Sequence, residues 1–370
     1  MTLSKIKIRG YKSIESLDLD LNSLNVLIGA NGSGKTNFIS IFKFLNQITE
    51  RNLNLYVKRA GGADSFLYYG QKHTEKIVIE LDFGSNVESN IYECFLVPTL
   101  DGSLIFEAEN TYFHDRARYT DRPYEKPLGS GHLESLLPVM AQDQKTGRIA
   151  KYVLKYLTSW RVYHFHDTSD TAPVKRIGDL NDNFYLRPDA ANLAAYLYGL
   201  KKTHNHHYQK IRDTIQLVAP FFDDFILRPM PENENKIQLE WREKGSDYPF
   251  LAYHLSDGTL RFICLTTLLL QPNIPSTILI DEPELGLHPY AINTLASLIK
   301  SAATRTQIII STQSVPLVNC FSLEDLLVVN RRNQATVIER LKPEEFASWL
   351  EDYSVGELWE KNVIGGRPSR

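Results

Sequence analysis

Leu24–Thr36 reads Leu-Asn-Val-Leu-Ile-Gly-Ala-Asn-Gly-Ser-Gly-Lys-Thr. The apolar residues at its start predict a short strand, and the segment after Thr36 predicts a helix. A strand, a glycine-rich turn and a helix in this order are the context of the phosphate-binding P-loop, Gly-x4-Gly-Lys-Thr. The glycines allow a tight turn in which successive backbone N–H groups point into one concavity.

This loop predicts a site for the β-phosphate of a nucleotide, because the following helix adds its positive N-terminal end. Lys35 is expected to reach the β- and γ-phosphates, and the Thr36 hydroxyl to coordinate Mg²⁺. A glycine turn without a ligand is the alternative, which the complete motif after an apolar strand disfavours. The residues expected to contact the nucleotide here are Asn31, Gly32, Ser33, Gly34, Lys35, Thr36 and Asn37.

A second motif lies at Thr277–Pro283, where an apolar strand ends in two carboxylates, Asp281 and Glu282. Asp281 is expected to hold Mg²⁺ through water, and Glu282 to polarise the attacking water as general base. The alternative is a buried strand followed by a helix-capping acid. With the P-loop upstream, the pattern is typical of a Walker B motif with a catalytic glutamate.

Leu255–Arg261 reads Leu-Ser-Asp-Gly-Thr-Leu-Arg and leads into an apolar helix. By itself it predicts a helix N-cap at Ser256. A serine hydroxyl and glycine amides at a helix N-terminus also form a phosphate-binding surface. Since the chain already has one phosphate loop, this surface would most simply serve a nucleotide bound by a neighbouring subunit.

These motifs, followed by Leu285–Pro289 (Leu-Gly-Leu-His-Pro), resemble in order those of ABC-type ATPases of the RecF, OLD and SMC kind. The opening Ile6–Ile14 also resembles their first hairpin. The resemblance implies a head domain that dimerises head to tail around two ATP molecules, with possible assembly into a higher oligomer. Ser256 and Gly258 would then contact the γ-phosphate held by the partner subunit, and Leu285–His288 would form the D-loop.

Two positions depart from that family. Members usually place a histidine after the strand that follows Walker B, whereas this chain has Gln313 there. An amide donates a hydrogen bond to phosphate but carries no charge, so slow hydrolysis is the hypothesis. The Q-loop residue stays open, with Gln142 and Gln144 as candidates by type and His166 by layout.

The predicted fold class is α/β, a P-loop NTPase of the ABC-ATPase head type. It has a mixed β-sheet core, an antiparallel β lobe and an inserted, mostly helical lobe. The expected domains are an N-terminal ATPase lobe at 1–115, an accessory region at 116–250 and a C-terminal ATPase lobe at 251–370. Within the accessory region, Arg116–Gly131 is expected to be an exposed loop.

The 370 residues are 43% hydrophobic, which is enough for substantial cores, and the net charge of −3 gives no global basic field. The three separated cysteines and the absence of a signal-like or membrane-spanning stretch predict a cytoplasmic protein without a membrane partner. Basic residues among tyrosines at 116–126 suit DNA contact, although acidic neighbours dilute them. His204–His207 matches no standard metal-ligand spacing and is expected to be a solvated helix end.

The expected function is an Mg²⁺-dependent ATPase that couples its nucleotide state to a separate effector protein, such as a nuclease, or to DNA. Its closest resemblance is to the OLD-like branch without a nuclease domain, which implies anti-phage defence or DNA maintenance. A RecF-like factor that clamps DNA directly is the main alternative. A transporter ATPase subunit is a third, which the N-terminal hairpin and the Ser-Asp-Gly-Thr sequence disfavour.

Overall fold

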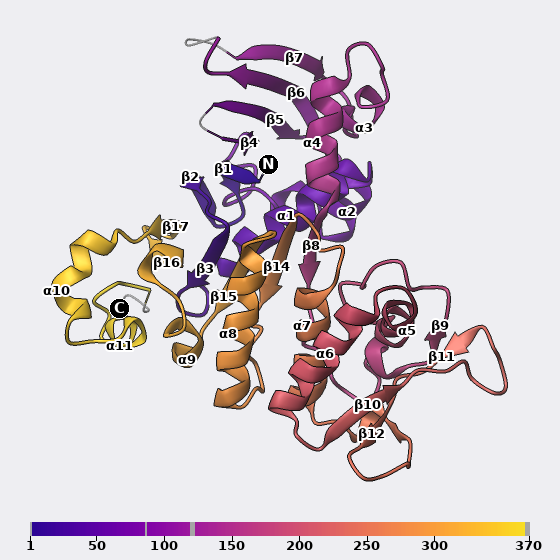
Figure 1. Ribbon diagram of the computed structural model, residues 1–370. Coiled ribbons are helices and arrows are strands. Elements are labelled where there is room, and N and C mark those ends of the chain that lie inside the picture. The colour runs from indigo at the N-terminus through magenta and orange to yellow at the C-terminus, as the bar shows by residue number, and fades with distance from the viewer. Residues whose placement is uncertain (1, 86, 119–122, 367–370) are drawn as a thin grey trace. The chain divides into compact units, whose positions relative to one another are not determined.

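The computed structural model describes residues 2–85, 87–118 and 123–366. It divides into two compact units, each described here by itself (Figure 1). The first unit comprises the chain up to Trp160 together with the residues from Ser322 onward, and the second is Arg161–Phe321. These divisions differ from the expected boundaries at 115 and 250, because the strand and helices between residues 116 and 160 belong to the first unit and residues 251–321 belong to the second.

An antiparallel sheet of six strands dominates the first unit, in the order β2-β1-β4-β5-β6-β7. Buried and partly exposed residues alternate along β4, as expected for a strand with one face on a core. Helix α4 (Arg148–Thr158) packs on this sheet, where the ring of Tyr156 stacks on Phe83. The strands are β1 (Leu3–Tyr11), β2 (Ile14–Asp20), β4 (Ile77–Gly84), β5 (Glu88–Pro98), β6 (Leu104–Asp115) and β7 (Tyr124–Gly129).

The phosphate-loop elements lie in the same unit. Every residue of β3 (Leu24–Ile28) is buried, and β3 pairs in parallel with β16 (Leu326–Arg332), which forms a hairpin with β17 (Ala335–Arg340). Helix α1 (Lys35–Thr49) follows the loop. The remaining helices of this unit are α2 (Leu53–Arg59), α3 (Leu137–Met140), α4 (Arg148–Thr158), α10 (Ala347–Leu350) and α11 (Val355–Glu360).

In the second unit, β14 (Thr277–Asp281) and β15 (Gln307–Thr312) pair in parallel and in register, with Asp281 opposite Ser311. Both are almost entirely buried, as parallel strands covered on both faces are. The helices here are α5 (Leu193–Thr203), α6 (Asn205–Val218), α7 (Asp257–Leu270), α8 (Pro289–Ala303) and α9 (Val315–Val318). The boundary between the two units lies within strand β8 (Trp160–Tyr163). The smaller strands are β9 (Gly178–Asp179), β10 (Phe222–Ile226), β11 (Lys236–Ile237), β12 (Glu240–Glu243) and β13 (Phe250–Leu251).

Two sequence-based expectations need correction. Within Arg116–Gly131, expected to be a loop, the structure forms edge strand β7, although residues 119–122 lie outside the described part. Its sequence Tyr-Glu-Lys-Pro-Leu-Gly hides the strand, since Pro127 is tolerated only at an edge and the charges break the apolar alternation. The region 116–250 is also less helical than the expected, mostly helical lobe, because several short strands lie between and after its helices.

No helix in the described ranges is both long and apolar enough to cross a membrane.

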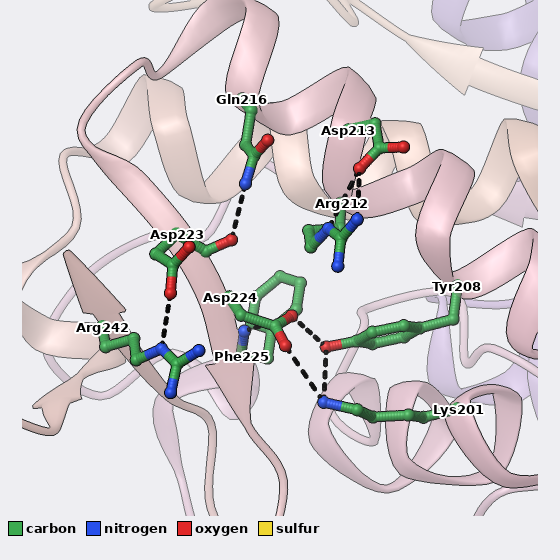
Figure 2. A network of polar contacts seen from close by, with 9 residues as sticks. All are labelled: Lys201, Tyr208, Arg212, Asp213, Gln216, Asp223, Asp224, Phe225 and Arg242. Carbon is green, nitrogen blue, oxygen red and sulfur yellow. Dashed lines mark hydrogen bonds and ion pairs between the residues drawn. The ribbon is translucent and has the colours of Figure 1, made fainter. Parts of the chain in front are cut away.

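A polar network in the second unit connects α5, α6 and β10 (Figure 2). Buried Tyr208 donates from its hydroxyl to Asp224 Oδ1 at 2.5 Å, and Lys201 lies 3.1 Å from Asp224 Oδ2. The backbone N–H of Phe225 also donates to Asp224, at 3.0 Å. Burial, followed by the neighbouring Asp224 carboxylate, raises the pKa of Tyr208, so the phenol stays protonated and remains a donor.

We expect Tyr208→Phe to lower the free energy of unfolding by about 1–3 kcal/mol, because it removes a buried hydrogen bond to a charged acceptor. Urea denaturation followed by circular dichroism measures this change. The matched control is Tyr198→Phe, which removes a hydroxyl that accepts from Lys202 at the surface. That control should change the free energy by less than about 0.5 kcal/mol; equal effects of the two substitutions would contradict the structural role of the network.

Candidate functional site: two motif clusters

The P-loop follows directly from the end of β3, and its glycines are required where they stand. Gly34 has φ +113° and N-caps α1, and a Cβ at this position would lie 2.0 Å from Thr336 Oγ1. Gly32, at φ +78°, lies in the left-handed region that residues with a side chain rarely adopt. The backbone therefore forms the turn that the sequence predicts between β3 and α1.

Lys35 is buried, with its ammonium donating to the carbonyl oxygens of Gly29 at 2.6 Å and Ala30 at 3.0 Å. The lysine thus ties the start of its helix to the start of the loop. Asn31, Gly32 and Thr36 are exposed, whereas Ser33 is buried. Asn37 donates to Ser13 Oγ at 2.7 Å. The predicted P-loop residues are therefore together on one turn, and their contact with a nucleotide stays a prediction.

Two long-range contacts support this loop, and the sequence motifs did not indicate either. The Thr336 hydroxyl, on β17, donates to the Ser33 carbonyl at 2.9 Å. The N–H of Ala30 donates to the Gly366 carbonyl at 2.8 Å, and the N–H of Gly366 donates to Asn330 Oδ1 at 2.8 Å. The segment around Gly366 is therefore docked on the P-loop.

Asp281 lies at the carboxyl end of β14 in the second unit, where ligands of parallel sheets usually bind. Its Oδ1 accepts from the Ser311 hydroxyl at 2.7 Å. His166 Nε2 lies 2.7 Å from the Asp281 carbonyl, which places the residue guessed for the Q-loop beside the Walker B strand. One ligand atom each of Asp281, His166 and His164 lie within 4.8 Å of one another. Oxygen and imidazole donors thus gather at this strand end.

Glu282 has an unusual backbone, with φ +42°. A non-glycine residue in this region is strained, and such strain is concentrated at functional sites. The backbone is held by the hydrogen bond from its own N–H to the Ser311 carbonyl at 2.8 Å. Gln313 Nε2 donates to Glu282 Oε1 at 2.5 Å, so the structure brings together two of the residues that the sequence assigned to catalysis.

The Ser-Asp-Gly-Thr segment forms the N-terminus of α7. Ser256 is its N-cap and accepts from the Thr259 N–H at 3.2 Å. A Cβ at Gly258 would lie 2.3 Å from the Gly286 carbonyl, so this glycine permits close approach of the predicted D-loop. The N-cap interpretation is therefore correct, and the phosphate-binding interpretation stays a prediction compatible with it.

Arg261 connects these segments, a role that the sequence did not suggest. Its guanidinium is buried and donates to the carbonyls of Phe165 at 2.9 Å, His166 at 3.2 Å and Leu285. Burial lowers the pKa of this arginine, an effect that the nearby Asp257 and Glu284 carboxylates oppose. Arg261 therefore holds the α7 N-terminus, the D-loop and the His166 segment in one arrangement.

Glu284 is a second carboxylate that the motif analysis did not assign. Its Oε1 accepts from the Thr312 hydroxyl at 2.5 Å, while its Oε2 is buried without a hydrogen bond in the part of the chain that the structure describes. Desolvation raises the pKa of this carboxyl above its usual value. Glu284 thus anchors the end of β15, next to Gln313.

A raised pKa means that the folded state holds the proton of Glu284 more tightly than the unfolded chain does. Its contribution to stability is therefore greatest below the usual glutamate pKa and is lost as the pH rises through the folded pKa. We expect the free energy of unfolding of Glu284→Gln, measured relative to that of the wild type, to rise from pH 5 to pH 8. The expected rise is about 1 kcal/mol, the scale of one unsatisfied buried polar group. Urea denaturation at the two pH values measures the difference, and a constant difference would contradict the assignment.

Residues 24–319 match the family model described as "AAA domain, putative AbiEii toxin, Type IV TA system". A curated relative, a UPF0173 metal-dependent hydrolase from Chloroflexus aurantiacus, is 28% identical over 123 residues. That match covers 30% of this chain and 51% of the relative, so the chain spans about half the length of the curated relative.

Solved structures support the same fold. The SMC head bound to the C-terminal winged-helix domain of ScpA has a TM-score of 0.61 and 14% identity, and the match covers 94% of this chain and 100% of that one. The Pyrococcus furiosus SMC head with an extended coiled coil, bound to the C-terminal domain of ScpA, has a TM-score of 0.57 and 13% identity, over 95% and 99% of the two chains. Together with the family match over most of the chain, this similarity shows that the protein belongs to the AAA_21 family of AAA-domain proteins and has the SMC-like ABC ATPase fold.

Proposed function

We propose that this protein binds and hydrolyses ATP with Mg²⁺, dimerises head to tail around the nucleotide, and couples that state to a separate effector protein. The observation that carries the proposal is Glu282, a carboxylate on a strained backbone, beside the Walker B aspartate and in contact with Gln313. Strain that is retained next to a predicted metal ligand favours catalysis over a purely structural role.

The oxygen ligands that the chain offers fit a nucleotide with bound Mg²⁺. Mg²⁺ prefers oxygen ligands, and the chain supplies the Thr36 hydroxyl and the Asp281 carboxylate. The close approach at Gly34 leaves no room for a side chain at the turn whose N–H groups would face the phosphates. When bound, the ion would neutralise phosphate charge. Lys35 would orient the β- and γ-phosphates, and Glu282 would accept a proton from the attacking water.

Exposure of the signature and D-loop segments supports a dimer. Ser256 is exposed at the α7 N-terminus, Leu285 in the adjacent D-loop is 47% exposed, and Tyr290 in the first turn of α8 is 54% exposed. Apolar side chains beside a helix N-terminus suit a surface that closes over a nucleotide held by a second copy. Each copy would then contribute Ser256 and Gly258 to the γ-phosphate bound by the other.

The test is the solution mass of Glu282→Gln with and without ATP and Mg²⁺. Removal of the base should trap the bound state, so we expect the mass to double with ATP, and to stay monomeric when Ser256→Arg is added. A mass that ATP leaves at the monomer value contradicts the head-to-tail dimer. A mass that is already dimeric without ATP contradicts nucleotide-driven association.

The effector is proposed to act in defence. The family description names a toxin of type IV toxin–antitoxin systems, and this favours a role in defence over one in general metabolism. A RecF-like DNA clamp predicts tight, ATP-dependent DNA binding by the purified protein alone. The effector proposal predicts that ATP leaves DNA affinity unchanged until a partner is added.

A further inference from the structure

A pocket of about 330 Å³ lies in the first unit between α4 and the antiparallel sheet. Asn90, Phe113 and Tyr124 form its sheet side, and they are direct cross-strand neighbours on β5, β6 and β7. Residues that are paired in this way point to the same face of a sheet. The pocket therefore follows one row of side chains across three strands, and none of its lining residues belongs to the P-loop.

The helix side is formed by Arg148, Tyr152 and Tyr156, spaced four residues apart on α4. Such spacing places all three on one helix face. Tyr156 stacks on the buried Phe83, with centroids 5.5 Å apart and planes 13° from parallel. Tyr152 is 43% exposed and Tyr124 is 60% exposed. The pocket is thus an aromatic slot that is open to solvent where Tyr152 and Tyr124 line it.

The mouth of this slot is bordered by positive charge. Helix α4 reads Arg-Ile-Ala-Lys-Tyr-Val-Leu-Lys-Tyr-Leu-Thr and contains no acidic residue. Arg148, Lys151 and Lys155 lie on adjoining positions of one side of the helix, next to Tyr152. None of the three forms an ion pair within the ranges that the structure describes. Their charge is therefore available to an anionic ligand along more than one turn of the helix.

Glu88 is the carboxylate that lines the pocket, two residues before Asn90 on β5. A carboxylate accepts hydrogen bonds and offers none when ionised. Among flat ligands, it favours those with an amino group on the ring edge and disfavours those with only carbonyl oxygens there. Cytosine and adenine carry such an exocyclic amine, and thymine does not.

We propose that this slot binds an unstacked nucleobase of a single-stranded nucleic acid, while the α4 cations contact the phosphates on either side. The aromatic rings stack on the base, and Glu88 accepts a hydrogen bond from its exocyclic amine. The cations Arg148, Lys151 and Lys155 neutralise the phosphates of the nucleic-acid backbone. An acidic peptide would use the cations but would leave Glu88 facing like charge, so the observations favour the nucleic acid. The proposal is independent of the proposed ATPase cycle, and its test uses no ATP.

The first measurement is the fluorescence anisotropy of a labelled oligodeoxycytidine of about 15 nucleotides, within the range of known single-strand sites. We expect Tyr152→Ala to weaken binding about tenfold, as the loss of one stacked base predicts, and Tyr152→Phe to stay within about twofold. The matched control is Tyr248→Ala, which removes a similarly exposed tyrosine from the second unit. Equal affinities of wild type and Tyr152→Ala would overturn the proposal.

Further comparisons separate the parts of the site. Oligodeoxycytidine should bind more tightly than oligothymidine, and Glu88→Gln should remove that preference. Lys151→Gln and Lys155→Gln should each make the affinity less dependent on salt concentration, by the amount expected for the loss of about one phosphate contact. Equal binding of duplex and single strand would overturn base insertion. If cytidine monophosphate bound as tightly as the oligonucleotide, the cations along α4 would contribute nothing to the affinity. That result would overturn the proposed contacts between these cations and the phosphates of a nucleic-acid strand.

Discussion

Lys35→Ala should lower the affinity for ATP about 100-fold or more. The substitution removes the predicted contact of an ammonium with the β- and γ-phosphates, and 100-fold corresponds to about 2.7 kcal/mol, within the range for a lost charge-assisted interaction. The structure adds a second cause. Lys35 donates to the carbonyls of Gly29 and Ala30, so its loss also removes two buried hydrogen bonds that hold the loop.

Isothermal titration with ATP and Mg²⁺ measures this affinity, with Lys43→Ala as the matched control. Lys43 lies on the same helix, is exposed and is two turns beyond the loop, so its removal should change the affinity by less than about threefold. Lys35→Arg is a second informative variant. Arginine keeps the charge, but its planar, forked head differs in shape from the compact ammonium that meets the two carbonyls. Near-normal ATP affinity of Lys35→Ala would exclude the P-loop as the nucleotide site.

Glu282→Gln should lower the rate of ATP hydrolysis about 100-fold or more while it leaves ATP affinity within about threefold. General base catalysis by a positioned side chain contributes rates of this size, and glutamine keeps the shape but does not accept the proton. The amide can still contact Gln313, so the strained backbone at Glu282 should persist. Steady-state phosphate release measures the rate, and titration measures the affinity.

The matched comparison is Glu284→Gln, the same chemical change two residues further along the chain. Glu284 is buried against Thr312, so we expect its substitution to slow hydrolysis by less than about tenfold. If the two variants lost activity equally, Glu282 would act through the structure of the strand end and would not be the base. If Glu282→Gln kept full activity, the general base would have to be another residue.

The local elements of this protein are predictable from its sequence alone. The glycine-rich turn, the helix after it and the N-cap at Ser256 depend on conformational freedom and capping within a few residues. The buried strand before Asp281 is equally local, since its continuous apolar run is typical of a parallel strand. The ATPase family and its fold followed from the order of these motifs, and the comparisons confirmed both, whereas the OLD-like branch stays a prediction.

The distant residues that support the motifs become evident only once the chain is folded. Thr336 and Gly366 reach the P-loop from more than 300 residues away, and no local pattern marks either as a contact. Arg261 and Glu284 are ordinary charged residues in the sequence, and their function follows from burial against carbonyls and a hydroxyl of other segments. Strand β7 likewise exists because β6 pairs with it, not because its own residues favour a strand. The physical reason is the same in each case: capping and turn formation use neighbours in the chain, whereas burial and pairing use neighbours in space.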